Sequence, residues 1–195
     1  MEKTFDPSKW FRFLMGIAIA SLVNSVAGLI PLALGSVTTW VSRGIMLAMA
    51  VYMFQLAPLN DRYRKAGIFR AGMLACALFT AFLFGSMAVT IAASVFSFVA
   101  VYQEFQAHAE VVFEKNPRLS RNWRSLFYWE ILVGILLSLG ATATAAILVV
   151  SGLQEGAGRI SSIVITVLSI PDLVLSVIYV RNLKKTGECF SAGDV

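Results

Sequence analysis

The residue that most clearly could do chemistry is Asp172, a carboxylate that directly follows Pro171 within a long apolar stretch. A carboxylate near the centre of a bilayer costs roughly 2.5–3.5 kcal/mol on insertion scales, so it usually faces the interior of a helix bundle. Pro171 has no backbone N–H and frees a carbonyl one turn earlier in the helix. Because transporters bind solutes and ions at such interruptions, the pair predicts a solute or ion site. The alternative is that Asp172 hydrogen-bonds a neighbouring helix and only fixes its packing.

Three more polar residues in apolar surroundings are candidate members of this site: Glu130, Asn24 and Gln55. Glu130 lies one to two turns inside its apolar segment, deep enough to need a partner. The expected counterions are three arginines at neighbouring helix ends: Arg70, Arg124 and Arg181. A buried carboxylate with such a partner is often only a packing device. Isolated amides such as Asn24 and Gln55 more often join two helices than bind a ligand.

Glu104 and His108 are four residues apart and therefore share one face of a helix. The pair would suit a metal ion, or His108 would transfer a proton near neutral pH. A catalytic zinc site needs three protein ligands and an open position. Because His108 is the only histidine, a metal site here would need further carboxylates, and no cofactor is expected. The ordinary interpretation of the pair is a solvated helix end.

The segment 103–124 is expected to continue a membrane helix into the cytoplasm, turn at Asn116-Pro117 and begin the next helix. Basic and aromatic residues at this point are candidate contacts for anionic lipid headgroups or for a protein partner. These residues are Arg118, Arg121, Trp123 and Arg124. Nucleic acid is not expected as a partner, because the basic clusters all adjoin apolar segments.

The elements that position these residues follow from the composition. Of the 195 residues 58% are hydrophobic and 14% are charged, and the mean hydropathy is +0.77. Soluble domains carry roughly 25% charged residues, so a conventional soluble enzyme and a disordered chain are excluded. A membrane helix needs about 20 apolar residues. The predicted spans are 13–35, 38–57, 68–85, 87–103, 126–150 and 160–180.

The count of six depends on the stretch 68–102. As one helix it would measure about 50 Å, which is too long for a hydrocarbon core of about 30 Å. A break at Gly85-Ser86 divides it into two spans. With six spans and the N-terminus inside, fourteen of the sixteen basic residues face the cytoplasm, as the positive-inside rule requires. Five spans would place the basic loop and the basic tail on opposite sides. We therefore predict one all-α domain over residues 1–195, a six-helix bundle in the cell membrane with both termini and the tail 186–195 cytoplasmic.

A weak internal similarity accompanies these spans. Tyr52, Tyr102 and Tyr179 stand at the ends of the second, fourth and sixth spans, as three tandem helical hairpins would place them. The alternative is that each cytoplasmic interface independently favours aromatic and basic residues.

Three functions remain open from the sequence. The first is a non-enzymatic membrane protein that binds or translocates a small solute, alone, as a homo-oligomer or as the membrane subunit of a larger transporter. The second is a scaffold or regulatory subunit that docks a partner through 103–124. The third is an intramembrane enzyme acting on lipids, with His108 or Glu104 as general base. The lack of HExxH, Gly-x-Ser-x-Gly, P-loop and GxGxxG motifs disfavours the third.

Overall fold

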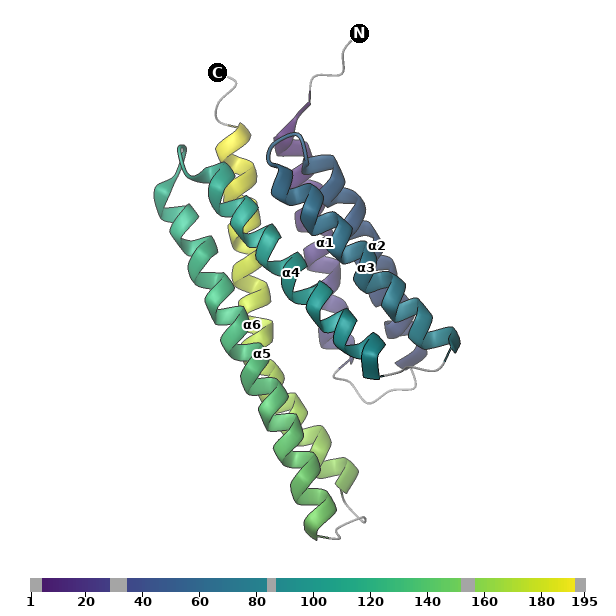
Figure 1. Ribbon diagram of the computed structural model, residues 1–195. Coiled ribbons are helices and arrows are strands. Elements are labelled where there is room, and N and C mark those ends of the chain that lie inside the picture. Colours follow the sequence, from purple (N-terminus) through teal and green to yellow (C-terminus); the bar gives the residue numbers. More distant parts are fainter. Residues whose placement is uncertain (1–4, 29–34, 84–86, 152–156, 192–195) are drawn as a thin grey trace.

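The computed structural model describes residues 5–28, 35–83, 87–151 and 157–191, which form six α helices and no strand (Figure 1). The helices are α1 Pro7–Gly28, α2 Gly35–Leu56, α3 Asp61–Leu83, α4 Met87–Val112, α5 Pro117–Ser151 and α6 Ala157–Ser191. The predicted all-helical fold is confirmed, and the stretch 68–102 lies in two helices. The predicted breaks at 85–86 and 152–156 lie outside the described residues.

Side-chain caps define where three of the helices begin. Asp6, Asn60 and Asn116 directly precede α1, α3 and α5, and each accepts a hydrogen bond from a backbone N–H two or three residues later. These acceptors satisfy N–H groups that have no partner within the helix. Pro7 and Pro117 occupy the first position of α1 and α5, where a missing N–H costs nothing. The turn predicted at Asn116-Pro117 is therefore a helix cap.

The six helices form a closed ring in chain order. Each packs against the next, α6 returns to α1, and α4 also touches α6. The described ends of the chain meet at the same end of the ring, where the hydroxyls of Ser8 and Ser191 are 2.5 Å apart (Figure 1). The two longest helices, α5 and α6, extend beyond the other four at the opposite end (Figure 1).

The packed core lies at the end of the ring that carries both chain ends. Large side chains with almost no exposed surface gather there: Phe11, Tyr63, Val112, Leu119, Trp123 and Leu183. Toward the other end, large apolar side chains are exposed on every helix, among them Val23, Leu47, Phe79, Ile91, Leu139 and Val167. Soluble monomers rarely expose apolar surface on this scale, so these side chains are suited to contact with lipid.

Four of the described helices are long and apolar enough to cross a membrane. They cover Pro7–Ala27, Val37–Leu56, Met87–Val112 and Pro117–Thr144, which supports a membrane-embedded protein. The described parts of α3 and α6 do not reach that limit. In α3 the reason is that five of the first ten residues are charged, which leaves 71–83 as about 20 Å of uncharged helix. A typical hydrocarbon core is about 30 Å thick.

Several helices continue past the apolar segments predicted from the sequence. The predicted spans end at 103 and 180 and begin at 126, whereas α4 ends at Val112, α6 ends at Ser191 and α5 begins at Pro117. Most of the segment expected as a C-terminal tail is therefore helix. These extensions form the packed end of the ring, and they position the first candidate site.

Candidate functional site

A carboxylate without exposed surface, Glu104 of α4, lies at the centre of the packed end. Arg70 of α3 donates hydrogen bonds to Glu104 Oε2 from Nη2 and from Nε, the latter at 3.1 Å. Tyr179 of α6 donates its hydroxyl hydrogen to Glu104 Oε1. The Arg70 side chain is itself only 13% exposed. A buried ion pair thus connects α3 and α4, and a hydrogen bond extends it to α6.

His108 lies one turn further along α4 and also has no exposed surface. Its Nδ1 is 2.8 Å from the hydroxyl of Tyr63, and its ring stacks on Trp123 with centroids 4.4 Å apart. Burial, followed by the charges of nearby glutamates, raises the pKa of the Tyr63 hydroxyl well above 10. The hydroxyl therefore stays protonated and is able to donate to Nδ1 of a neutral imidazole that carries its proton on Nε2. Trp123 Nε1 continues the chain of contacts by donating to Thr186 Oγ1 at 3.0 Å.

These contacts bear on one interpretation of Glu104 and His108, the solvated helix end. The two side chains share a face of α4, with His108 Nε2 3.7 Å from Glu104 Oε1. A solvated helix end is excluded because neither side chain is exposed. The described residues contain no group of three His, Cys, Asp or Glu side chains that could hold a metal ion. With no exposed surface on either residue, the cluster has the form of a joint between helices.

A second ion pair between α3 and α4 is more exposed. Arg62 Nε lies 2.8 Å from Glu110 Oε1, and the two side chains are 34% and 37% exposed. Asn60 also donates to Glu110, at 2.9 Å. Exposed pairs of this kind contribute about 0–1 kcal/mol. The pair has the same residue types as Arg70–Glu104 and differs mainly in solvent access.

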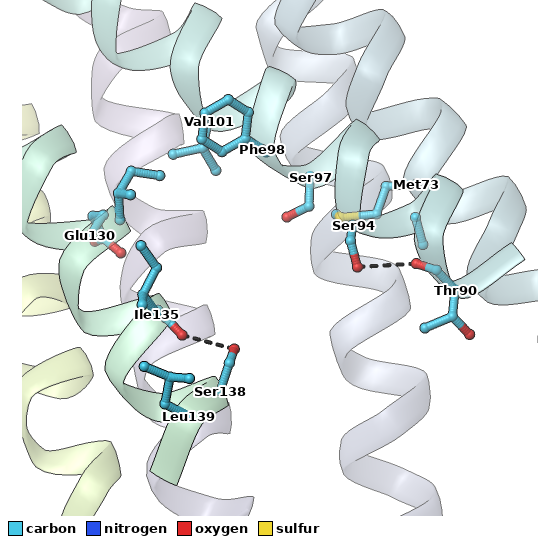
Figure 2. Close-up of a pocket in the computed structure, with 13 residues that line it drawn as sticks. Met73, Thr90, Ser94, Ser97, Phe98, Val101, Glu130, Ile135, Ser138 and Leu139 are labelled. Carbon is cyan, nitrogen blue, oxygen red and sulfur yellow. Dashed lines mark hydrogen bonds between the residues drawn. The ribbon is translucent and has the colours of Figure 1, made fainter. Parts of the chain in front are cut away.

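The second candidate site is an open cavity of about 860 Å³ between α4 and α5, bordered by Met73 of α3. Glu130 is the one charged residue among the described residues that line it. Four hydroxyl side chains accompany it: Thr90, Ser94, Ser97 and Ser138. Figure 2 shows the residues of α4 and those of α5 facing each other across the open space.

Two of the four hydroxyls of the cavity donate hydrogen bonds to their own helices. Ser94 Oγ donates to the Thr90 carbonyl at 3.0 Å, and Ser138 Oγ donates to the Gly134 carbonyl at 2.9 Å (Figure 2). Each oxygen keeps lone pairs with which to accept a further hydrogen bond. Glu130 makes no salt bridge with any basic residue in the described parts of the chain. The cavity therefore combines an unpaired carboxylate with hydrogen-bond acceptors.

The other residues predicted for a solute site do not line this cavity. Asn24 Nδ2 donates to Ser42 Oγ at 2.8 Å, which joins α1 to α2. Gln55 is exposed near the end of α2, and α6 continues as helix through Pro171 to a half-buried Asp172. None of these four lines the cavity with Glu130. Arg70, an expected partner of Glu130, instead pairs with Glu104.

The basic residues predicted to contact lipid or a partner lie on the first turns of α5. Arg118, Arg121 and Arg124 are exposed, as such contacts require. Trp123 has no exposed surface and stacks on His108. The predicted contact of Trp123 with lipid or a partner is therefore wrong, because the indole faces the core.

Sequence reasoning did not identify Tyr63, Thr186 or the buried role of Tyr179. Tyr63 stands in a polar stretch, 60–65, where nothing in the local pattern indicates burial. The available signal was Phe105, His108 and Val112, whose spacing of three and four residues continues a buried helix face past the apolar segment.

Comparison with known proteins finds no matching protein-family model, no similar curated protein and no similar solved structure. The functional interpretation therefore depends on the geometry of the buried joint and of the open cavity.

Proposed function

We propose that this chain is a six-span membrane protein with both termini cytoplasmic, and that it binds or translocates a small solute in the cavity between α4 and α5. The observation that carries the proposal is Glu130, an unpaired carboxylate in an open cavity that is otherwise lined by hydroxyl and apolar side chains. An unpaired carboxylate in surroundings of low dielectric constant is costly unless it takes up a proton or a ligand compensates it.

The ring of helices supports the six-span topology. Helix α3 packs between α2 and α4, and α6 packs between α5 and α1. Because the four flanking helices are apolar enough to cross a membrane, α3 and α6 cross it with them. Exposed basic residues at the packed end favour a cytoplasmic position for that end under the positive-inside rule. They include Arg64, Lys65, Arg118, Arg121 and Lys184.

The lining of the cavity indicates the chemistry of the solute. Glu130 would attract a cationic or hydrogen-bond-donating group, and Ser94 and Ser138 would accept further hydrogen bonds. Most of the remaining wall is apolar, with Phe98 and Leu139 among its side chains. Pockets for small molecules typically combine an apolar wall with a few polar groups. The solute is therefore expected to be a small organic amine with an apolar body.

The test is thermal stabilisation of the purified protein by a panel of small amines, compared with carboxylic acids of matched size. Amines are expected to stabilise the wild type, and Glu130→Gln is expected to abolish the effect without unfolding the protein. Gly134→Leu is a second test, because a Cβ at Gly134 meets no atom within 4 Å and the larger side chain would fill the cavity. Glu114→Gln, at an exposed carboxylate outside the cavity, is the matched control.

Two results would contradict the proposal: no amine stabilises the wild type, or Glu130→Gln and Gly134→Leu respond to amines as the wild type does. Asp172→Asn tests the site predicted from the sequence separately. A loss of amine binding in Asp172→Asn alone would place the solute at α6 and away from Glu130.

A second candidate function is docking of a protein partner at the turn between α4 and α5. The observation that favours it is Phe113, a large exposed apolar side chain in the turn that precedes the exposed Arg118 and Arg121. Reversing the charge of both arginines is expected to dissociate a partner that co-purifies from native membranes. A partner-free protein from those membranes would contradict docking.

A further inference from the structure

A smaller cavity of about 330 Å³ lies in the groove between the start of α5 and the later part of α6. Its polar residues from α5 are Asn122 and Ser125, and those from α6 are Arg181, Asn182 and Lys185. Asn122 and Ser125 are three residues apart on α5, and Arg181 and Lys185 are four residues apart on α6, which places each pair on one face of its helix. The described residues that line the groove include two cations and no carboxylate.

Asn182 is the residue that most needs a ligand. It is only 3% exposed, yet its amide nitrogen Nδ2 has no hydrogen-bond partner among the residues that the structure describes. Buried polar groups are almost always hydrogen-bonded, so an exception requires an explanation. Arg181 and Lys185 border the same groove, and neither forms an ion pair with an acidic residue in the described parts of the chain. The groove thus presents several N–H donors and positive charge to whatever occupies it.

The apolar residues of the groove lie on the side toward the middle of the helices. Trp129 follows Ser125 by one turn, and Ile178 and Leu175 precede Arg181 by one and two turns. The predicted spans 126–150 and 160–180 place these three residues inside the apolar layer and the polar ones just outside it. Tryptophan is enriched at this level of the bilayer. From the packed end toward the middle of the helices, the groove is therefore lined first by basic, then by aromatic and then by aliphatic side chains.

We propose that this groove binds the phosphate group of an anionic phospholipid. Arg181 and Lys185 contact the phosphate oxygens, Asn182 Nδ2 donates to one of them, and an acyl chain lies along Ile178 and Leu175. Guanidinium and ammonium groups are the usual partners of phosphate oxygens, and basic grooves between membrane helices recognise anionic headgroups. A soluble phosphate compound would use the same donors but would leave the apolar half of the groove empty. The site is independent of the cavity between α4 and α5 and requires only that α5 and α6 lie in a bilayer.

The test is native mass spectrometry of the protein released from nanodiscs of phosphatidylcholine that contain a minor fraction of phosphatidylglycerol. The wild type is expected to retain phosphatidylglycerol in preference to phosphatidylcholine. The double variant Arg181→Gln, Lys185→Gln is expected to lose about 30-fold in affinity, because each basic side chain contributes a factor of about five. The matched control is Arg64→Gln, Lys184→Gln, which removes two exposed basic residues outside the groove and is expected to retain the lipid.

Asn182→Leu keeps the size of the side chain and removes the donor, so a loss of about tenfold is expected. The proposal is overturned if the groove variant retains phosphatidylglycerol as the wild type does, or if the control loses it equally. Equal retention of phosphatidylcholine would also overturn it, because the charge of the headgroup would then be irrelevant. Displacement of the lipid by inorganic phosphate at equal concentration would assign the groove to a soluble phosphate compound instead.

Discussion

Removing the charge of Glu104 is expected to destabilise the protein far more than the same change at Glu110. Glu104→Gln keeps the shape of the side chain and its hydrogen bond from Tyr179, but it leaves the buried guanidinium of Arg70 without a counterion. Breaking a buried ion pair from one side costs about 3–5 kcal/mol. Because 13% of the Arg70 side chain is exposed, we expect the lower end, about 3 kcal/mol.

The double variant Arg70→Met, Glu104→Gln is expected to recover most of this loss. Removing both charges leaves no unpaired ion, and an apolar replacement of a buried pair is often neutral. The double variant should therefore unfold within about 1 kcal/mol of the wild type, although each single variant costs about 3 kcal/mol. At the exposed pair, Arg62→Met and Glu110→Gln should each cost at most about 1 kcal/mol, separately and together.

The assay is reversible unfolding in mixed micelles by increasing dodecyl sulfate, followed by tryptophan fluorescence and circular dichroism. Trp123, one of four tryptophans, lies in the same cluster and contributes to the fluorescence change when the cluster opens. Two results would refute the reasoning: Glu104→Gln costs no more than Glu110→Gln, or the effects of Arg70→Met and Glu104→Gln simply add in the double variant. Either result would mean that water reaches the buried pair.

Two further predictions concern α3. Gly67→Ala should destabilise the protein by about 1–2 kcal/mol, because a Cβ there would lie 3.2 Å from a backbone carbonyl of α2. At Gly44, by contrast, a Cβ meets no atom within 4 Å, so Gly44→Ala should stabilise the protein by up to about 1 kcal/mol. Equal effects in the unfolding assay would show that α2 and α3 are not closely packed. The side chain of Lys65 hydrogen-bonds Asp61 and holds the pKa of Asp61 below its usual 3.8. The contribution of this hydrogen bond to folding stability is therefore present above pH 3.8 and is lost as the pH falls through the lowered pKa. Asp61→Asn should lower the melting temperature near neutral pH and have no effect in acid; a difference that persists in acid would contradict this origin.

The sequence predicted the number and order of the helices because both follow from the length of apolar stretches. The division of 68–102 needed only the thickness of a bilayer. The helix ends at the packed end were placed less well, since hydropathy reports only the part of a helix that suits lipid. Beyond that part α4 is held by one buried face, which includes Phe105, His108 and Val112. Such a face resembles that of any amphipathic helix in contact with water.

The candidate sites were harder to predict, because each depends on which helices meet. Spacing places Glu104 and His108 on one face, but their burial is due to Arg70, Tyr63 and Trp123 from two other helices. A single sequence does not specify those contacts. The cavity beside Glu130 likewise depends on α4 and α5 standing apart, which no local pattern encodes.

Because the first helix packs against the last, the ring of helices cannot close until synthesis of the chain is nearly complete. Chains emerge from the ribosome N-terminus first, so α1 enters the membrane long before its second neighbour exists. Until α6 is complete, Phe11 lacks the ring of Phe190, which stacks on it with centroids 5.5 Å apart. Before α6 is made, the ring is open between α1 and the last helix that has been synthesised. It closes only when α6 packs against α1.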